Sequence, residues 1–157
     1  MTPEEWLALI GESVDAFNRY RASHPDAAVV LVEADLAWAN LEHINFEGAD
    51  LRRCRLEGCN LQGARLDGAQ MDHANLRAAR LAGASLRGVT LKSGVFQGAD
   101  LRHAALDGAS LKRVVFCDAD LTGAVFTGAD LAEADLRWAK FELDDLSDAD
   151  LSSARLR

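Results

Sequence analysis

The 157-residue sequence is poor in aromatic residues and cysteine. Aromatic residues make up 6% of the chain although 49% of it is hydrophobic, which favours a narrow core of small and aliphatic side chains. The three cysteines are an odd number without framework spacing, which argues against a disulfide scaffold. We expect reduced thiols, with Cys54 and Cys59 in the core.

Long apolar runs and a basic N-terminal segment are missing as well. No run approaches the roughly 20 apolar residues that a membrane-spanning helix needs. The first residues, MTPEEWLALIGES, are acidic where a secretory signal peptide would be basic. The sequence therefore predicts a soluble cytoplasmic protein that has no membrane partner.

Positive charge is in deficit. The chain has 17 Lys and Arg against 25 Asp and Glu, a net charge of −8, which disfavours direct nucleic-acid binding. The sign alternates along the chain: residues 26–50 hold six acidic and no basic residues, 51–117 hold five and 11, and 118–150 hold ten and two. Opposite charges on neighbouring segments can pair; an ordinary mixed surface is the alternative.

What the sequence does contain is an unbroken five-residue repeat. Every fifth residue from Leu31 to Leu156 is Leu, Phe or Met, and two places before it stands a small or modest apolar residue, usually Ala. The stretch GADLRHAALDGASLKRVVF shows the unit. A period of five fits neither an α-helix nor an ordinary strand and indicates a repeat architecture.

This unit resembles the A(D/N)LXX repeat of the pentapeptide-repeat family over about 130 of the 157 residues. The resemblance implies an all-β fold, a right-handed quadrilateral parallel β-helix in which four repeats of 20 residues form one coil. It also implies about 6.5 coils in this chain, with the central residue and the small residue pointing inward. Successive coils would rise by about 4.8 Å, the usual spacing of paired strands.

Glycine marks the corners of the coils. Ten of the 12 glycines stand two places after a central residue, where a type II turn requires a positive φ. One edge carries glycine in five successive coils: Gly48, Gly68, Gly88, Gly108 and Gly128. Another edge has none at the matching places: Arg53, His73, Ser93 and Arg113. We predict type II turns along the first edge and another turn type along the second.

The chain departs from the repeat at its start and near its end. Thr2, Pro3 and Glu5 form a capping-box pattern that opens an amphipathic helix over about 3–22. We therefore expect an N-terminal capping helix in residues 1–26 and the β-helix in 27–157, with the apolar stripe of the helix covering the first coil. Asp144 occupies an inward slot, so we expect the coil near 143–148 to be distorted or this carboxylate to turn to water.

No pattern in the sequence indicates catalysis. The histidines are His24, His43, His73 and His103. His43 and His103 would lie on the same side but three coils, or about 14 Å, apart, too far to share a metal ion. No glycine is followed by Lys and then Ser or Thr, as it would be in a phosphate-binding loop. We predict a protein that is not an enzyme and has no cofactor and no metal site.

Outward apolar residues form the first candidate site, an interface. They are Val95, Val115, Cys117, Trp138, Leu143, Leu151 and Leu156. Exposed apolar side chains that gather in a patch favour a binding partner, and local packing is the alternative. We expect Trp38 to pack against the N-terminal segment. The uncovered C-terminal coil favours an end-to-end homodimer, with fraying of the last half-coil as the alternative.

An acidic partner surface is the second candidate site. Its residues are Asp118, Asp120, Asp130, Glu133, Asp135, Asp145, Asp148 and Asp150. For most Asp and Asn before a central residue, a hydrogen bond to the local backbone is the simpler explanation.

Two functions fit these features. The first is a non-enzymatic protein-binding or scaffold protein that acts through the faces of a rigid acidic rod. The alternative follows from similarity to the quinolone-resistance members of the family, which implies a DNA-mimicking binder of DNA gyrase or topoisomerase IV. The basic segment 51–117 is a poor imitation of duplex DNA and argues against this alternative.

Overall fold

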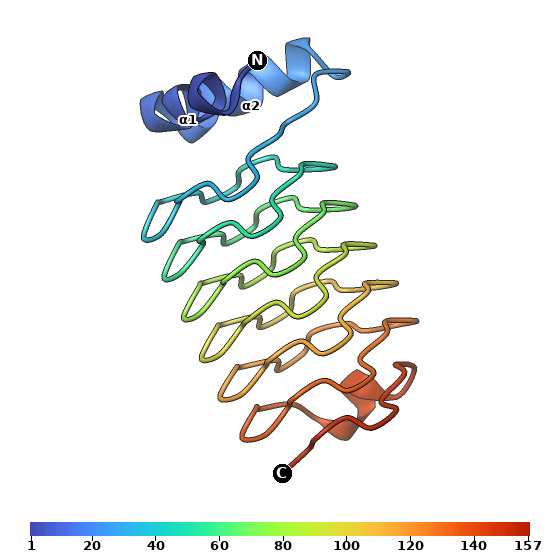
Figure 1. The fold of residues 1–157 in the computed structure, drawn as a ribbon. Helices are drawn as coiled ribbons and strands as arrows, with labels where there is room; N and C mark the ends of the chain where they lie inside the picture. Colours follow the sequence, from blue (N-terminus) through green and yellow to red (C-terminus); the bar gives the residue numbers. More distant parts are fainter.

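The computed structural model describes the backbone of residues 1–157 and every side chain except that of Leu143. Two helices, α1 (Pro3–Glu12) and α2 (Val14–Ser23), precede a stack of square coils, and a 3-10 helix, η1 (Leu143–Leu146), interrupts the last coils. Figure 1 shows the two helices lying across one end of the stack and the C-terminus at the other end.

The coils form a β-helix with a 20-residue turn. Parallel bridges join outward residues before the central ones to their counterparts 20 residues later, from Val30 and Asp50 to Asp135 and Arg155, with a break after Val125. The bonds run both ways between coils, as where the Leu81 N–H donates to the Asp100 carbonyl (2.7 Å) and the Asp100 N–H donates to the Ala79 carbonyl (3.0 Å). Each side of a coil therefore contributes one bridging residue, and the chain turns a corner every five residues.

All corners from Glu33 to Trp138 share one backbone conformation. The third residue of each turn has a positive φ, whether it is glycine, such as Gly68 (66°), or not, such as Arg53 (59°). A bond closes each turn, as from the Ala84 N–H to the Leu81 carbonyl (2.9 Å). The prediction of another turn type along the edge of Arg53, His73, Ser93 and Arg113 was wrong. The inter-coil bonds fix the corner geometry and outweigh the roughly 1–2 kcal/mol that a non-glycine residue loses there.

The axis of the stack is dry and apolar. Central residues such as Leu81 and small residues such as Ala79 have no exposed surface, which confirms the predicted inward positions. Among the residues whose burial is described, none that is polar or charged is buried. Cys54 and Cys59 are free thiols in the small inward slot, and burial raises the pKa of each to about 12.

Asp144 breaks the ladder as the sequence predicts. Its carboxylate is exposed to solvent, and the chain around it folds into η1 in place of a corner. The column of bridges that contains Ala105 and Val125 ends there, although Asp130 and Asp150 pair again further on. The local cost of burying a carboxylate is thus avoided by a local change of backbone.

The N-terminal segment forms two helices where the sequence predicted one over about 3–22. The predicted capping box of Thr2 and Glu5 is present and starts α1. The chain is extended at Ser13 (φ −175°), whose hydroxyl accepts the Ala16 N–H (3.0 Å) and thereby starts α2. Ser13 is thus a second N-cap that divides the helix in two. The apolar stripe continues past Ser13 and therefore does not indicate the break.

The two helices cover the first coil with aromatic side chains. Trp6 and Phe17 are fully buried, and their ring centroids are 5.5 Å apart. The Phe17 ring also meets the edge of Phe46, a central residue of the first coil, at 5.4 Å. The apolar end of the coil stack is thereby closed by the segment that the sequence assigns to this role.

Asn18 of α2 also replaces a missing coil neighbour. Deeper in the stack, the N–H of Arg65 donates to the carbonyl of Ile44, which lies in the coil before it (2.9 Å). The matching N–H of Asn45 has no earlier coil, and it donates to Asn18 Oδ1 (2.8 Å) while Asn18 Nδ2 donates to the His43 carbonyl (3.0 Å). One amide thus satisfies the open N–H on one side of the first coil.

Arg21 acts in the same way one turn along α2. Its guanidinium donates through Nη1 to the Ala27 carbonyl (2.9 Å) and through Nη2 to the Glu47 carbonyl (2.7 Å). Deeper in the stack, a carbonyl at the position of Glu47 accepts a backbone N–H from the preceding coil, as the Asp67 carbonyl does from Gly48 (2.9 Å). The helices are therefore attached by hydrogen bonds as well as by apolar packing.

Replacement of Asn18 tests this attachment. We expect Asn18→Ala to lower the free energy of unfolding by about 1–3 kcal/mol, because the Asn45 N–H and the His43 carbonyl both lose their partners. Urea unfolding followed by circular dichroism measures the change. Asn18→Asp keeps an acceptor for the Asn45 N–H and should lose less stability. Equal stability of Asn18→Ala and the native protein would mean that solvent serves these groups equally well.

Candidate functional site

The structure gathers no catalytic constellation among the side chains that it describes. No three His, Cys, Asp or Glu of this set lie close enough together to hold a metal ion. Two histidine rings lie on glycines of the next coil, His43 over Gly63 and His103 over Gly123. His24 stacks on Tyr20 with ring centroids 4.1 Å apart. Within the described residues, neither helix has the length and apolar character to cross a membrane.

Four of the seven apolar candidates lie on one side of the coils. Val95 and Val115 are direct bridge partners, and both are half-buried in an outward column that runs from Asp35 to Arg155. Cys117 follows Val115 by two residues and is only 8% exposed. We call Val95, Val115, Cys117 and Trp138 the valine patch. Its members come from three successive coils of the rigid stack.

Trp138 is the most exposed member of the valine patch. Its side chain is 67% exposed, and its backbone has a φ of 59°, which is unusual for a bulky residue. Arg137 lies beside it, with the guanidinium carbon 5.2 Å from the ring centroid. Arg137 is held in turn by two bonds to Asp135, from Nε (2.8 Å) and from Nη2 (2.7 Å). The exposed ring therefore rests on an anchored cation.

Trp38 occupies the matching corner near the other end of the stack. It does not pack against the N-terminal segment as expected, since 72% of it is exposed. Its ring covers Gly58 in the next coil, where a Cβ atom would lie 2.2 Å from Trp38 Cζ3. Gly58 is therefore required by the ring above it as well as by its own φ of 62°.

The remaining apolar candidates lie elsewhere. Leu151 and Leu156 belong to the C-terminal end of the axis, where Leu151 is half-buried and Leu156 is 45% exposed. Leu156 follows Arg155, the bridge partner of Asp135, so it belongs to the inward column of Leu136 and not to the outward column of the two valines. The side chain of Leu143 lies outside the described residues.

Arg137 and its pairing with Asp135 were missed in the sequence analysis, which named Asp135 only as part of an acidic surface. The signal was present, because ADLR occurs three times and each copy places Asp and Arg outward on one side, two residues apart. All three copies form the same bidentate pair: Asp50 with Arg52, Asp100 with Arg102 and Asp135 with Arg137.

The Arg137 guanidinium holds the pKa of Asp135 well below its ordinary value. A carboxylate of this kind stabilises the fold above its ordinary pKa of about 3.9, and the stabilisation is lost as the pH falls through the lowered value. We therefore expect the native protein to lose more stability than Arg137→Gln between about pH 5 and pH 2. Urea unfolding at each pH measures this. In an Asp135→Asn background the two proteins should respond alike, and a difference that persists there would contradict the assignment.

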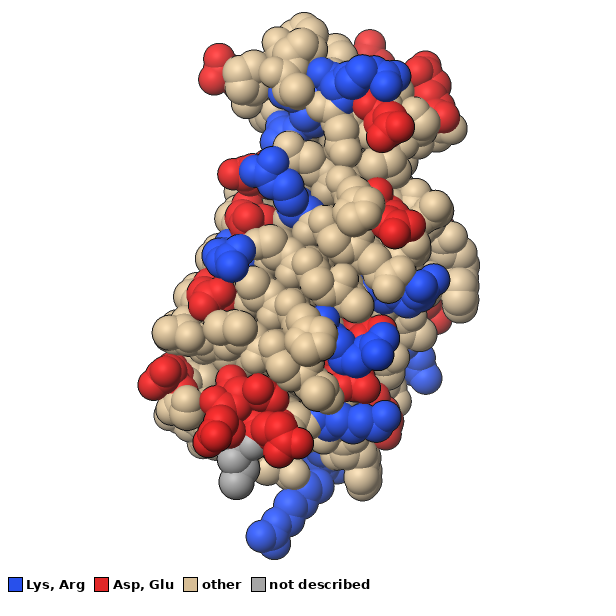
Figure 2. Space-filling model, turned by 180° about the vertical axis from the view of Figure 1, so that it is seen from behind, with Lys and Arg blue, Asp and Glu red and all other residues tan. Residues whose placement is uncertain are grey.

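The acidic candidates are spread over all four sides of the rod. Four of them accept the backbone N–H two residues on, which confirms the local explanation for these: Asp120, Asp130, Asp135 and Asp150. Glu133 lies 3.4 Å from Lys112, and Asp145 accepts the Glu142 N–H (2.9 Å). Asp118 and Asp148 are exposed corner residues. Figure 2 shows acidic side chains gathering near the C-terminal end of one face, whose middle is largely uncharged.

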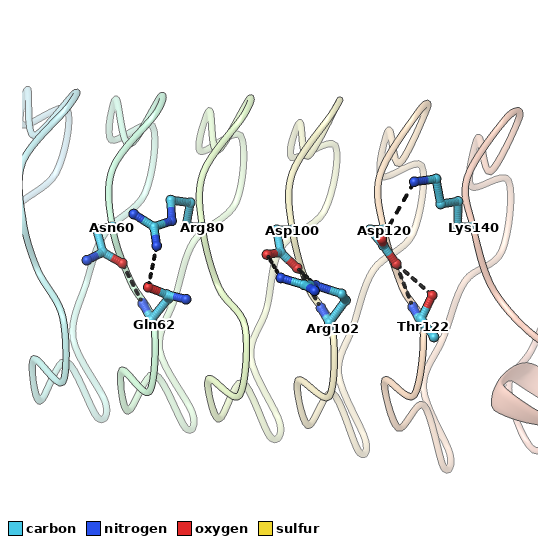
Figure 3. A network of polar contacts seen from close by, with 8 residues as sticks. All are labelled: Asn60, Gln62, Arg80, Asp100, Arg102, Asp120, Thr122 and Lys140. Atoms are coloured by element: carbon cyan, nitrogen blue, oxygen red, sulfur yellow. Dashed lines mark hydrogen bonds and ion pairs between the residues drawn. The ribbon is translucent and has the colours of Figure 1, made fainter.

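Charges on another side of the rod satisfy one another. Figure 3 draws eight residues of this side: Asn60, Gln62, Arg80, Asp100, Arg102, Asp120, Thr122 and Lys140. Asp100 binds Arg102 through both oxygens (2.8 Å each), and Asp120 accepts the Thr122 hydroxyl (2.7 Å) and lies 3.8 Å from Lys140. This ladder fixes the surface and pairs its carboxylates with cations or a hydroxyl, whereas Arg80 is bonded to a neutral amide.

Comparison with known proteins agrees with this geometry. A family model, "Pentapeptide repeats", matches eight copies of the repeat over residues 30–68, 54–92, 69–108, 95–131 and 109–143. The chain belongs to the pentapeptide repeat family. No curated protein matches it significantly.

Solved structures of pentapeptide repeat proteins are similar to the chain. One from the thylakoid lumen of Arabidopsis thaliana is 27% identical, with 64% of this chain and 74% of that one covered and a TM-score of 0.51. Rfr23 from the cyanobacterium Cyanothece 51142 is 24% identical over 89% and 97% of the two chains, with a TM-score of 0.54. HetL from the cyanobacterium Nostoc is 36% identical over 83% of this chain and 65% of its own length, with a TM-score of 0.37. The two with the higher scores support the β-helix as the fold.

Proposed function

We propose that this pentapeptide repeat protein is a non-enzymatic, cytoplasmic protein-binding scaffold. In this proposal a right-handed, four-sided β-helix presents the valine patch to a protein partner. The observation that carries it is the exposed Trp138 ring, which rests on an anchored arginine at a corner of the side that carries two outward valines. Proteins of this family are generally structural or binding proteins, which supports the same class of function.

The physical state of Trp138 favours recognition. An exposed indole in a left-handed backbone conformation gains little from the fold, whereas tryptophan and arginine are the residues that most often dominate binding energy. Arg137, which lies against the ring, is held by two bonds to Asp135. Little conformational entropy would be lost when a partner covers this surface.

A comparison of the two exposed tryptophans tests the proposal. The native protein, Trp138→Ser and Trp38→Ser would be immobilised, and proteins retained from an extract of the source cells would be quantified. We expect one partner to be lost with Trp138→Ser and kept with Trp38→Ser, which occupies the matching corner. The proposal fails if the retained proteins do not differ between native protein and Trp138→Ser.

Binding of DNA gyrase or topoisomerase IV by DNA mimicry is a second candidate. The net charge of −8 and the exposed carboxylates of Glu142, Asp144 and Asp148 favour it. Supercoiling by purified gyrase, with and without a quinolone, tests it. Neither inhibition nor protection at micromolar protein would remove this candidate.

An end-to-end homodimer through the C-terminal coil accompanies both candidates. Leu156 at this end is 45% exposed and Leu151 is half-buried, so a second copy would cover apolar surface. Sedimentation of the native protein and of Leu151→Lys tests the dimer. A native protein that is already monomeric at tens of micromolar would contradict it.

A further inference from the structure

We propose that the valine patch binds an acidic, extended segment of the partner, with an aliphatic side chain on Val95 and Val115 and carboxylates on Arg77 and Arg113. This inference rests on the proposed function, because it names the chemistry of the partner at the same patch. It follows from the charges around the two valines, which differ in sign from the protein as a whole.

Two exposed arginines flank the valines. Arg113 stands at the corner two residues before Val115, and Arg77 reaches from the preceding coil to Gln97, two residues after Val95 (Nη1 to Oε1, 2.9 Å). Within the described part of the chain, neither guanidinium has a carboxylate within ion-pair distance. Each is therefore a cation that a partner's carboxylate can approach, because a bond to a neutral amide leaves the charge uncompensated.

The carboxylates near the patch do not cancel these cations. Asp135 lies directly after Val115 in the outward column, and both of its oxygens are bound by Arg137. Asp118 is exposed at the next corner, at the other end of the side that carries Val115 and beyond Cys117, and it is one carboxylate against two free guanidiniums. The local charge is therefore positive on a protein whose net charge is −8. A partner with carboxylates would be attracted here and repelled by the acidic coils further along.

The apolar part of the site needs a short extended segment. Val95 and Val115 are neighbours across one coil spacing, about 4.8 Å, which one leucine or isoleucine side chain can cover. In an extended chain, residues next to such an anchor project to the other face, and residues two places away return to the same face at about 6.6 Å. Alternating Leu and Glu, with Ser at intervening positions, therefore places an anchor and its flanking carboxylates on one face.

Synthetic peptides of defined chemistry test the proposal. Three 13-residue peptides would be compared. Each consists of one four-residue unit repeated three times and followed by the first residue of that unit. The units are Glu-Ser-Leu-Ser, Lys-Ser-Leu-Ser and Glu-Ser-Ser-Ser. Binding would be measured by fluorescence anisotropy, and the methyl NMR signals of Val95 and Val115 would locate it. We expect the Glu–Leu peptide to bind and shift these methyl signals, and the other two peptides to bind at least about tenfold more weakly.

Two charge reversals provide a matched pair. Arg77→Glu and Arg80→Glu change the net charge equally within one coil, and each removes a guanidinium that is bound to a glutamine, Gln97 or Gln62. Only Arg77 flanks the valine patch. We expect Arg77→Glu to lower the affinity for the Glu–Leu peptide about tenfold. Arg80→Glu should change this affinity less than about twofold.

Several results would overturn the inference. These are equal binding of the Lys–Leu or Glu–Ser peptide, methyl shifts on another side of the rod, equal effects of the two reversals, or no binding of the Glu–Leu peptide. If the acidic peptide fails while retention of a partner still depends on Trp138, the proposed function stands and only the acidic chemistry is wrong. If Trp138→Ser retains every partner, the proposed function fails whatever the peptides do.

Discussion

Leu81→Lys is expected to abolish the folded coil stack. Leu81 lies on the axis with no exposed surface, between the central residues Leu61 and Leu101 of the neighbouring coils, which are equally buried. An ammonium group at this place would have no hydrogen-bond acceptor and no water. Burial of an unpaired charge costs several kcal/mol or more, which is comparable to the whole stability of a domain of this size.

The next residue gives a matched control. Ala82 follows Leu81 on the outer surface and is partly exposed, so Ala82→Lys adds the same group to water. Urea unfolding by circular dichroism should show a native-like transition for Ala82→Lys and none for Leu81→Lys. A soluble, cooperatively folded Leu81→Lys protein would mean that the central residues do not form the core.

The five-residue period determined which side chains lie inside, and this part of the fold could be predicted residue by residue. Each central residue is confined to the axis because its neighbours at the corners must turn outward. The same register predicts that Val95 and Val115 are neighbours in successive coils, and the bridge between them confirms this. Because the repeat has no insertions, the inward position assigned in one unit is the inward position in every coil.

Corner geometry and the N-terminal helices could not be predicted equally well. Glycine statistics suggested two turn types, but the inter-coil bonds impose a positive φ on Arg53 and His73 as on Gly68. Ser13 lies within the apolar stripe, and only its extended backbone reveals the break between α1 and α2. In both places a bond or a backbone angle set by the tertiary structure outweighs the local preference of the residue.

The candidate site divides in the same way. The sequence register predicted the column of Val95 and Val115, but the anchoring of Trp138 depends on how Arg137 turns between Asp135 and the ring. The ADLR motif signals the pair of Arg137 with Asp135, but the position of the Trp138 ring against this guanidinium has no signature in the period. The acidic candidates were grouped by their position along the chain, whereas a 20-residue coil distributes such a group around all sides of the rod.

Phe17→Ala should release the N-terminal helices from a stack that otherwise stays folded. The Phe17 ring joins Trp6 to Phe46, so its loss leaves a cavity between the helices and the first coil. Removal of a buried phenylalanine side chain costs about 3–5 kcal/mol. The coils bond to their neighbours independently of this contact, and in a repeat protein such a loss stays local.

The emission of Trp6 reports this release directly. Trp6 is fully buried whereas Trp38 and Trp138 are exposed, so a Trp38→Phe, Trp138→Phe background leaves one buried indole. In that background we expect Phe17→Ala to shift the emission maximum to the red in water while the far-ultraviolet dichroism of the coils persists.

Phe116→Ala is the control, because it removes the same side chain from the middle of the stack, where it stacks on Phe96 at 5.0 Å. It should lower the urea midpoint of the coils and leave the emission of Trp6 in water unchanged. Loss of both signals together in Phe17→Ala would mean that the helices and coils unfold as one unit, and that the first coil cannot persist without its cover.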